Sequence, residues 1–134
     1  MEKMIQGALQ TSRVIAVVGL SNKTDRPSFQ VAKYLQENGY KIVPVNPTVS
    51  EVLGQRSYPD LESVPEKVDL VDVFRRSEEV LPIAEQAVKI HPAYFWMQED
   101  VENEDAKKLL EANNIAVIMN RCIKKEHLRI IEKP

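Results

Sequence analysis

The sequence predicts a doubly wound α/β protein, in which helices cover both faces of a parallel sheet of five strands. Five short apolar runs alternate with segments of helical periodicity along the 134 residues. The first run, residues 13–19, is rich in β-branched side chains and has almost no polar alternation, which is typical of a strand buried on both faces. Parallel strands joined by helices need right-handed crossovers, so helices are expected on both sides of the sheet.

The first half of the chain is expected to add two helices and a second strand to this first strand. Apolar residues recur at helical spacing across residues 4–9, so a short helix precedes the first strand. Ser28 is a candidate N-cap for the next helix, which ends at the Asn-Gly stop signal of residues 38–39. Residues 40–45 form the second strand.

The second half is expected to begin with a loop and then to continue the alternation of strands and helices. Residues 48–65 form a loop with one short turn around Pro59 and Asp60. Asn103 precedes two acidic residues and is predicted to cap a helix. The remaining elements are strands at residues 68–74, 93–97 and 115–119, a helix that begins between residues 77 and 82 and ends near residue 89, and a terminal helix at residues 124–132.

Composition and charge exclude several classes of protein. Apolar residues make up 43% and charged residues 28% of the chain, which fits one folded domain over residues 1–134 and excludes disorder by composition. The 18 basic and 20 acidic residues leave a net charge of −2, without the basic excess of a general nucleic-acid-binding protein. Cys122 is the single cysteine of the sequence and cannot form an internal disulfide. One cysteine and 2 histidines are too few for a plausible zinc site, so no metal is expected.

The sequence has no pattern of a membrane or secretory segment. Its longest apolar run, residues 14–20, is far shorter than the roughly 20 residues that span a bilayer. The first residues, Met1-Glu2-Lys3, do not lead into a signal-peptide core. We therefore expect a cytoplasmic protein that has neither a membrane nor a nucleic acid as its partner.

The segments that follow the strands predict where a ligand binds. A doubly wound fold holds its ligands outside the carboxyl ends of its strands. Three arginines and one lysine in these segments predict a locally positive edge, which the balanced overall charge conceals. The segments contain Gly19, Leu20, Ser21, Asn22 and Lys23, then Asn46 and Pro47, then Arg75 and Arg76, then Gln98, and finally Asn120, Arg121 and Cys122.

The sequence of the turn after the first strand restricts which ligands are expected to bind there. Gly19 is not followed by the further glycines of a G-x-G-x-x-G dinucleotide motif, and the second strand ends in Asn46-Pro47 rather than in an acidic residue. A phosphate loop of the G-x-x-x-x-G-K-[ST] type is absent as well. A glycine turn that leads into a helix N-terminus predicts a phosphate site, with added charge from Lys23 and Arg26. A purely structural role for the turn is the alternative.

Several other polar residues have structural interpretations. Arg75 and Arg76 are expected to divide, one facing the ligand and the other solvated or paired with Glu78 or Glu79. His127 belongs to the predicted terminal helix and is interpreted as a packing residue rather than a catalytic one. No histidine is expected near the carboxyl edge of the sheet.

Short motifs in a fixed order run across nearly the whole chain: Val17-Val18-Gly19-Leu20-Ser21, Arg26-Pro27-Ser28, Gly39-Tyr40, Pro44-Val45-Asn46-Pro47, Glu51, Gly54, Val68-Asp69, Val73-Phe74-Arg75 and Arg121-Cys122. This ordered set resembles the small, single-domain coenzyme A-binding proteins. It is also similar to the N-terminal CoA-binding domain of the succinyl-CoA synthetase alpha subunit. The set as a whole is far more specific than any one of its motifs.

The resemblance implies a Rossmann-like domain that holds CoA, with the pyrophosphate at the turn after the first strand. Two positions depart from the family pattern, because Glu99-Asp100 stands where the family reads on to a glycine, and Asn120 stands where the family has an aspartate. The catalytic histidine of the synthetase lies in a second domain, outside the resemblance. The residues that the resemblance assigns to the cleft are Gly19, Leu20, Ser21, Arg26, Ser28, Asn46, Pro47, Phe74, Arg75 and Gln98, and we add their neighbours at the strand ends, Asn22, Lys23, Arg76 and Cys122.

We interpret the protein as a module that binds CoA or an acyl-CoA without catalysis of its own, and we assign no catalytic residue. A nucleophile needs a base within hydrogen-bond reach, and Ser21 has no histidine near it in the sequence. One alternative is an enzyme that acts on a CoA thioester with Cys122 as the nucleophile, because the neighbouring Arg121 and a helix start would favour the thiolate. A CoA arm lying across the strand ends would also bring its thiol near Cys122 for disulfide exchange, whereas a buried, packing cysteine is the structural interpretation. Another is a CoA-sensing regulatory module for a partner protein. A homodimer is open as well.

Overall fold

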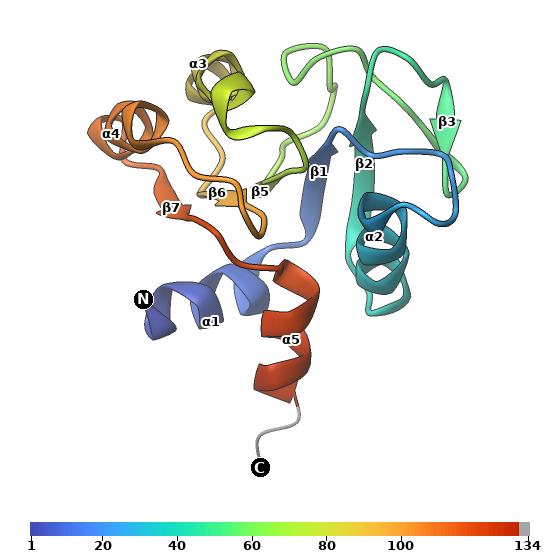
Figure 1. The fold of residues 1–134 in the computed structure, drawn as a ribbon, viewed down its shortest axis with the longest axis horizontal. Coiled ribbons are helices and arrows are strands. Elements are labelled where there is room, and N and C mark those ends of the chain that lie inside the picture. Colours follow the sequence, from blue (N-terminus) through green and yellow to red (C-terminus); the bar gives the residue numbers. More distant parts are fainter. Residues whose placement is uncertain (132–134) are drawn as a thin grey trace.

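The computed structural model describes residues 1–131, and Figure 1 shows one sheet between two layers of helices. The five strands lie in the order β2-β1-β5-β6-β7, and all four strand pairings are parallel. This topology confirms the predicted doubly wound, Rossmann-like α/β fold. The strands are β1 (Val14–Val18), β2 (Lys41–Val45), β5 (Leu70–Val73), β6 (Tyr94–Met97) and β7 (Ala116–Ile118).

The helices divide between the two faces of the sheet. One face carries α1 (Glu2–Thr11), α2 (Pro27–Glu37) and α5 (Ile123–Ile131), whose buried apolar residues form one core cluster. The other face carries α3 (Val80–Ile90) and α4 (Glu104–Ala112), whose buried residues form a second cluster (Figure 1). The strands between these layers are apolar on both sides, which explains why the first strand shows no polar alternation.

The structure corrects the expectation that Ser28 caps α2. The helix begins at Pro27, its N-cap residue is Arg26, and no side chain caps it. The Ser28 hydroxyl instead accepts a hydrogen bond of 3.0 Å from the backbone N–H of Ser21. The predicted cap of α4 is confirmed, because the Asn103 side chain accepts a hydrogen bond from the backbone N–H of Ala106.

The prediction of a single turn within residues 48–65 is also wrong in part. This segment contains a small antiparallel hairpin of β3 (Glu51–Val52) and β4 (Gln55–Arg56). A short 3-10 helix, Ser77–Glu79, precedes α3 inside the window where a helix start was predicted. The predicted terminal helix extended to residue 132, which lies outside the described residues.

Within residues 1–131, no helix is long and apolar enough to cross a membrane. Nor do the described residues contain a group of three or more His, Cys, Asp or Glu side chains that could hold a metal ion.

Asp72 carries a carboxyl group in the middle of the sheet. The residue lies on β5 in register with Val17 of β1 and Trp96 of β6, and it is fully buried. Neither carboxyl oxygen has a hydrogen-bond partner among the described residues. Burial therefore raises the pKa of Asp72 well above its usual value, because the apolar surroundings disfavour the charged form.

We predict that Asp72→Asn stabilises the protein by a margin that grows with pH. Because its pKa is higher in the folded state, the Asp72 carboxyl contributes stability that is complete below the pKa of the unfolded chain, near 4. This contribution is lost as the pH rises toward the pKa of the folded state. The asparagine side chain does not titrate. The difference in melting temperature between the variant and the parent should therefore increase by at least about 3 °C from pH 5 to pH 8. Thermal unfolding at both pH values checks this, and an unchanged difference between the two proteins contradicts it.

Candidate ligand-binding cleft at the carboxyl edge of the sheet

A cleft of about 920 Å³ lies along the carboxyl ends of the parallel strands. This volume is within the range of pockets that hold drug-sized or cofactor-sized molecules. Twelve of the fourteen predicted site residues line it: Gly19, Ser21, Asn22, Lys23, Arg26, Ser28, Asn46, Phe74, Arg75, Arg76, Gln98 and Cys122.

The other two predicted residues do not line this cleft. Leu20 is fully buried in the core, and its carbonyl oxygen accepts a hydrogen bond of 3.0 Å from the Asn46 side chain. Pro47 lines a second, smaller cavity of about 440 Å³ between the strand ends and the start of α3. Arg75 and Glu79 line both cavities and therefore lie between them.

The turn after β1 requires glycine at position 19. Gly19 has a φ angle of +86°, and a Cβ atom there would lie 2.3 Å from the carbonyl oxygen of Phe74 and 3.0 Å from Cδ of Arg75. Any larger residue would push β1 away from the end of β5. The missing side chain thus lets the first turn pass directly against the residues that follow β5.

Hydrogen bonds to two serine hydroxyls hold the loop from Gly19 to Arg26 in shape. The Ser28 hydroxyl accepts the N–H of Ser21, and the Ser21 hydroxyl accepts the N–H of Lys23 at 3.0 Å. The N-terminus of α2 opens on the cleft, and its N-cap residue, Arg26, makes no side-chain capping bond. Backbone N–H groups of an uncapped helix start, together with the helix dipole, favour an anion there.

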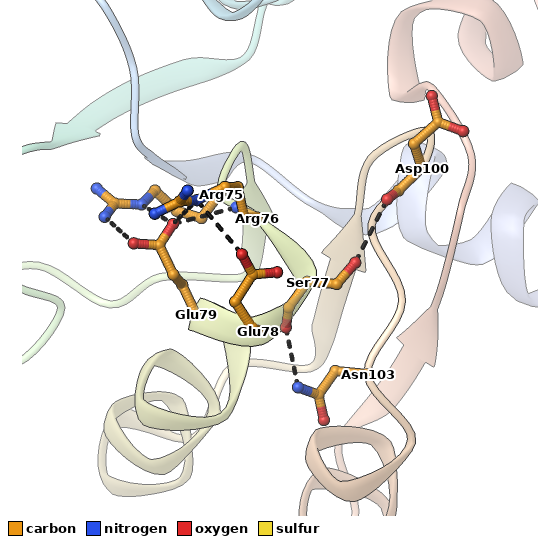
Figure 2. A network of polar contacts seen from close by, with 7 residues as sticks. All are labelled: Arg75, Arg76, Ser77, Glu78, Glu79, Asp100 and Asn103. Atoms are coloured by element: carbon orange, nitrogen blue, oxygen red, sulfur yellow. Dashed lines mark hydrogen bonds and ion pairs between the residues drawn. The ribbon is translucent and has the colours of Figure 1, made fainter.

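The charges at the exit of β5 differ from the sequence expectation. Both arginines pair with one carboxylate: Glu79 accepts hydrogen bonds from Arg75 at 2.9 and 3.4 Å and from the side chain of Arg76 at 3.5 Å (Figure 2). Arg76 also lies 3.5 Å from Glu78. Arg76, which is 76% exposed, is the solvated and paired arginine, and Arg75 lines the cleft but is paired as well, which the sequence did not indicate.

These contacts remove most of the predicted positive charge. Two guanidinium groups and two carboxylates at the β5 exit leave no net charge there, and Arg121 is paired with Glu126 at 3.8 Å. Lys23 and Arg26 are the cleft cations without an acidic partner among residues 1–131. The hydrogen bonds from Arg75, with further ones from Arg76, lower the pKa of Glu79 to about 2, so its carboxylate is ionised at any physiological pH.

Loops after three strands are hydrogen-bonded together at the far wall of the cleft. The backbone N–H of Asp100 donates to the Asn120 side chain at 2.6 Å. Figure 2 shows the second contact, in which the Ser77 hydroxyl lies 3.3 Å from the Asp100 carbonyl oxygen. The buried Gln98 side chain accepts the N–H of Ile123 at the start of α5. Asp100 and Asn120, both at departures from the family pattern, have φ angles of +68° and +60°, which Asp and Asn tolerate better than most residues.

Cys122 lines the cleft, is half-buried and forms no disulfide. His127 is buried against two tyrosine rings, and its Nδ1 lies 2.6 Å from the Tyr34 hydroxyl. This contact confirms that His127 is a packing residue. Burial also lowers its pKa, so the ring favours the neutral form.

Eight residues of the cleft were not predicted. Pro27 and Val31 lie one turn apart on α2, and Thr48 and Val49 directly follow the predicted Asn46-Pro47 step, so a wider window around each strand end would have included them. Glu79 gave no signal as a site residue, because acidic residues are unexpected in an anion site. The eight are Pro27, Val31, Thr48, Val49, Glu79, Glu99, Asp100 and Val101.

Comparisons with known proteins agree with this architecture. The family model described as "CoA binding domain" matches residues 13–128. YneT of Bacillus subtilis, an uncharacterised protein, is 43% identical over 123 residues, which cover 92% of this chain and 91% of YneT. The ADP-forming acetate–CoA ligase II of Archaeoglobus fulgidus is 36% identical over 58 residues, which are 42% of this chain and only 9% of the ligase.

Solved structures show the same fold over nearly the whole chain. A hypothetical protein from Pyrococcus horikoshii superposes with a TM-score of 0.94 at 35% identity, covering 98% of this chain and 92% of that one. A protein from Thermus thermophilus superposes with a TM-score of 0.92 at 30% identity, covering 97% and 98% of the two chains. Since the family model spans most of the sequence, the chain belongs to the CoA-binding domain family.

Proposed function

We propose that the protein binds coenzyme A or an acyl-CoA in the cleft at the carboxyl edge of its sheet, without catalysing a reaction of its own. The observation that carries this proposal is the uncapped N-terminus of α2, which opens on the cleft beside the Gly19 turn. Membership of the CoA-binding domain family supports CoA as the anion-bearing ligand.

The phosphates of CoA are assigned to the basic side of the cleft. Lys23 and Arg26 have no acidic partner among the described residues and flank the helix N-terminus. Arg75 lies against the Gly19 turn, so its guanidinium group is within the same part of the cleft. Charge-assisted hydrogen bonds of this kind are about twice as strong as neutral ones, so the phosphates supply most of the affinity.

The uncharged arm of CoA is assigned to the other side of the cleft. Gln98, Val101 and Cys122 line this side and offer a mixed apolar and polar surface without a basic residue. The thiol or thioester would then lie near Cys122. The purine is assigned to the opposite end, beside Asn46 and Val49.

We predict that CoA stabilises the protein more than NADH or ATP does. The turn after β1 lacks the further glycines of a dinucleotide or mononucleotide motif, so these nucleotides lose contacts that CoA does not need. A ligand at 100 times its dissociation constant stabilises by about 2.7 kcal/mol, which a thermal-shift measurement at equal ligand concentrations detects. Equal stabilisation by NADH would contradict the assignment of the cleft to CoA.

We further predict that Arg75→Ala weakens CoA binding by about 10-fold, as measured by calorimetry, because it removes charge-assisted contacts to a phosphate. Arg76→Ala is the matched control, because its side chain is 76% exposed against 39% for Arg75, and its loss should stay below about 3-fold. Melting temperatures of both variants verify that the fold is intact. Equal affinity of Arg75→Ala and the parent removes Arg75 from the site.

A further inference from the structure

The acidic side chain of Glu79 lies on the basic side of the cleft, between Arg75 and Arg76. The Glu79 carboxylate receives hydrogen bonds from both Nε and Nη2 of Arg75, and from the backbone N–H and Nε of Arg76 at 3.3 and 3.5 Å (Figure 2). Three of these donors belong to guanidinium groups, which pair equally well with carboxylate and with phosphate. Glu79 thus holds the donors that a phosphate group of a ligand would need.

The pairing with Glu79 is easy to exchange for a better anion. The Arg75 and Glu79 side chains are 39% and 31% exposed, and ion pairs with this much solvent contact contribute little to stability. The carboxylate stays ionised throughout the physiological pH range, so a change of pH does not release the arginines. Only another anion or a high salt concentration can do so.

The position of Glu79 gives the displaced carboxylate somewhere to go. Glu79 lines the large cleft and also the smaller cavity beside Pro82 and Gln86. A rotation of its side chain toward the smaller cavity leaves the charge in contact with water. Burial of an unpaired carboxylate, which would oppose the exchange, is thereby avoided.

We propose that Glu79 is an internal competitor for the phosphate groups of the ligand and sets the affinity of the cleft. In the free protein its carboxylate neutralises Arg75 and Arg76, and a phosphate replaces it when the ligand binds. This inference rests on the proposed binding of CoA and adds a residue that lowers the affinity. Lys23 and Arg26 attract the ligand first because they are not neutralised, and Arg75 at the β5 exit is then transferred from Glu79 to the ligand.

The test compares CoA binding by Glu79→Gln, Glu78→Gln and the parent protein in calorimetry at low and high salt. Glutamine keeps the shape of the side chain and can still accept the N–H of Arg76, so the start of the 3-10 helix is preserved. We expect Glu79→Gln to bind CoA about 5- to 20-fold more tightly at low salt, with a smaller gain at high salt. Glu78→Gln removes the same charge one residue away and should change the affinity less than 2-fold.

A double-mutant cycle with Arg75→Ala separates competition from simple charge repulsion. If Glu79 acts by holding Arg75, replacing Glu79 by glutamine should raise the affinity for CoA less than about 3-fold when Arg75 is absent. An equal gain with and without Arg75 overturns the proposal in favour of repulsion through space. Weaker binding by Glu79→Gln also overturns it, because Glu79 would then position Arg75 for the ligand.

Pyrophosphate serves as a second probe that does not depend on CoA. It should raise the melting temperature of Glu79→Gln more than that of the parent. If the parent binds neither CoA nor pyrophosphate, the proposed function and the competition by Glu79 both fail. If the parent binds CoA and Glu79→Gln binds it equally well, the competition alone fails.

Discussion

The backbone of Gly19 passes against the carbonyl oxygen of Phe74, at a distance that leaves no room for a Cβ atom. β1 and β5 are parallel neighbours in the sheet, so their exits lie side by side, and the Gly19 turn passes directly against the residue that follows β5. The start of α2 and the two arginines after β5 consequently meet at one edge. The rest of the candidate site depends on this contact, because a wider turn would separate the helix N-terminus from Arg75.

Ser28 shapes the loop after the first strand, and the start of α2 has no side-chain cap. A capping serine stands just before the first helical residue, whereas Ser28 is the second residue of α2. Its hydroxyl accepts the backbone N–H of Ser21, and the N-cap residue, Arg26, makes no capping bond. An unsatisfied helix end costs stability in the free protein, and a bound anion restores it. A helix start of this kind favours an anion, and the proposed function places a phosphate of CoA there.

Hydrophobic periodicity predicted the order of the strands and helices, because each element is either buried on both faces or buried along one stripe. Periodicity did not predict the β3–β4 hairpin, because each of its strands has only two residues. Its turn places Leu53 and Gly54 at positive φ angles of 55° and 76°. Leucine is rare in that conformation, so the sequence carries no recognisable turn signal there. Strand-end reasoning likewise located most of the cleft and named Glu78 and Glu79 as partners for one arginine, but it missed that Glu79 pairs with Arg75 as well. Pairing depends on which side chains meet in space, and Glu79 meets both arginines only because the 3-10 helix follows them directly.

The most direct test of CoA binding at this edge is a titration of nitrogen-15-labelled protein with CoA, followed by the backbone amide signals in NMR spectra. The account predicts that the largest shifts fall on the exits of the strands, at Gly19, Ser21 and Gln98, while Leu110, buried in α4 on the far side of the sheet, stays unchanged. Shifts that cluster on α4, or no shifts at a saturating CoA concentration, would contradict it.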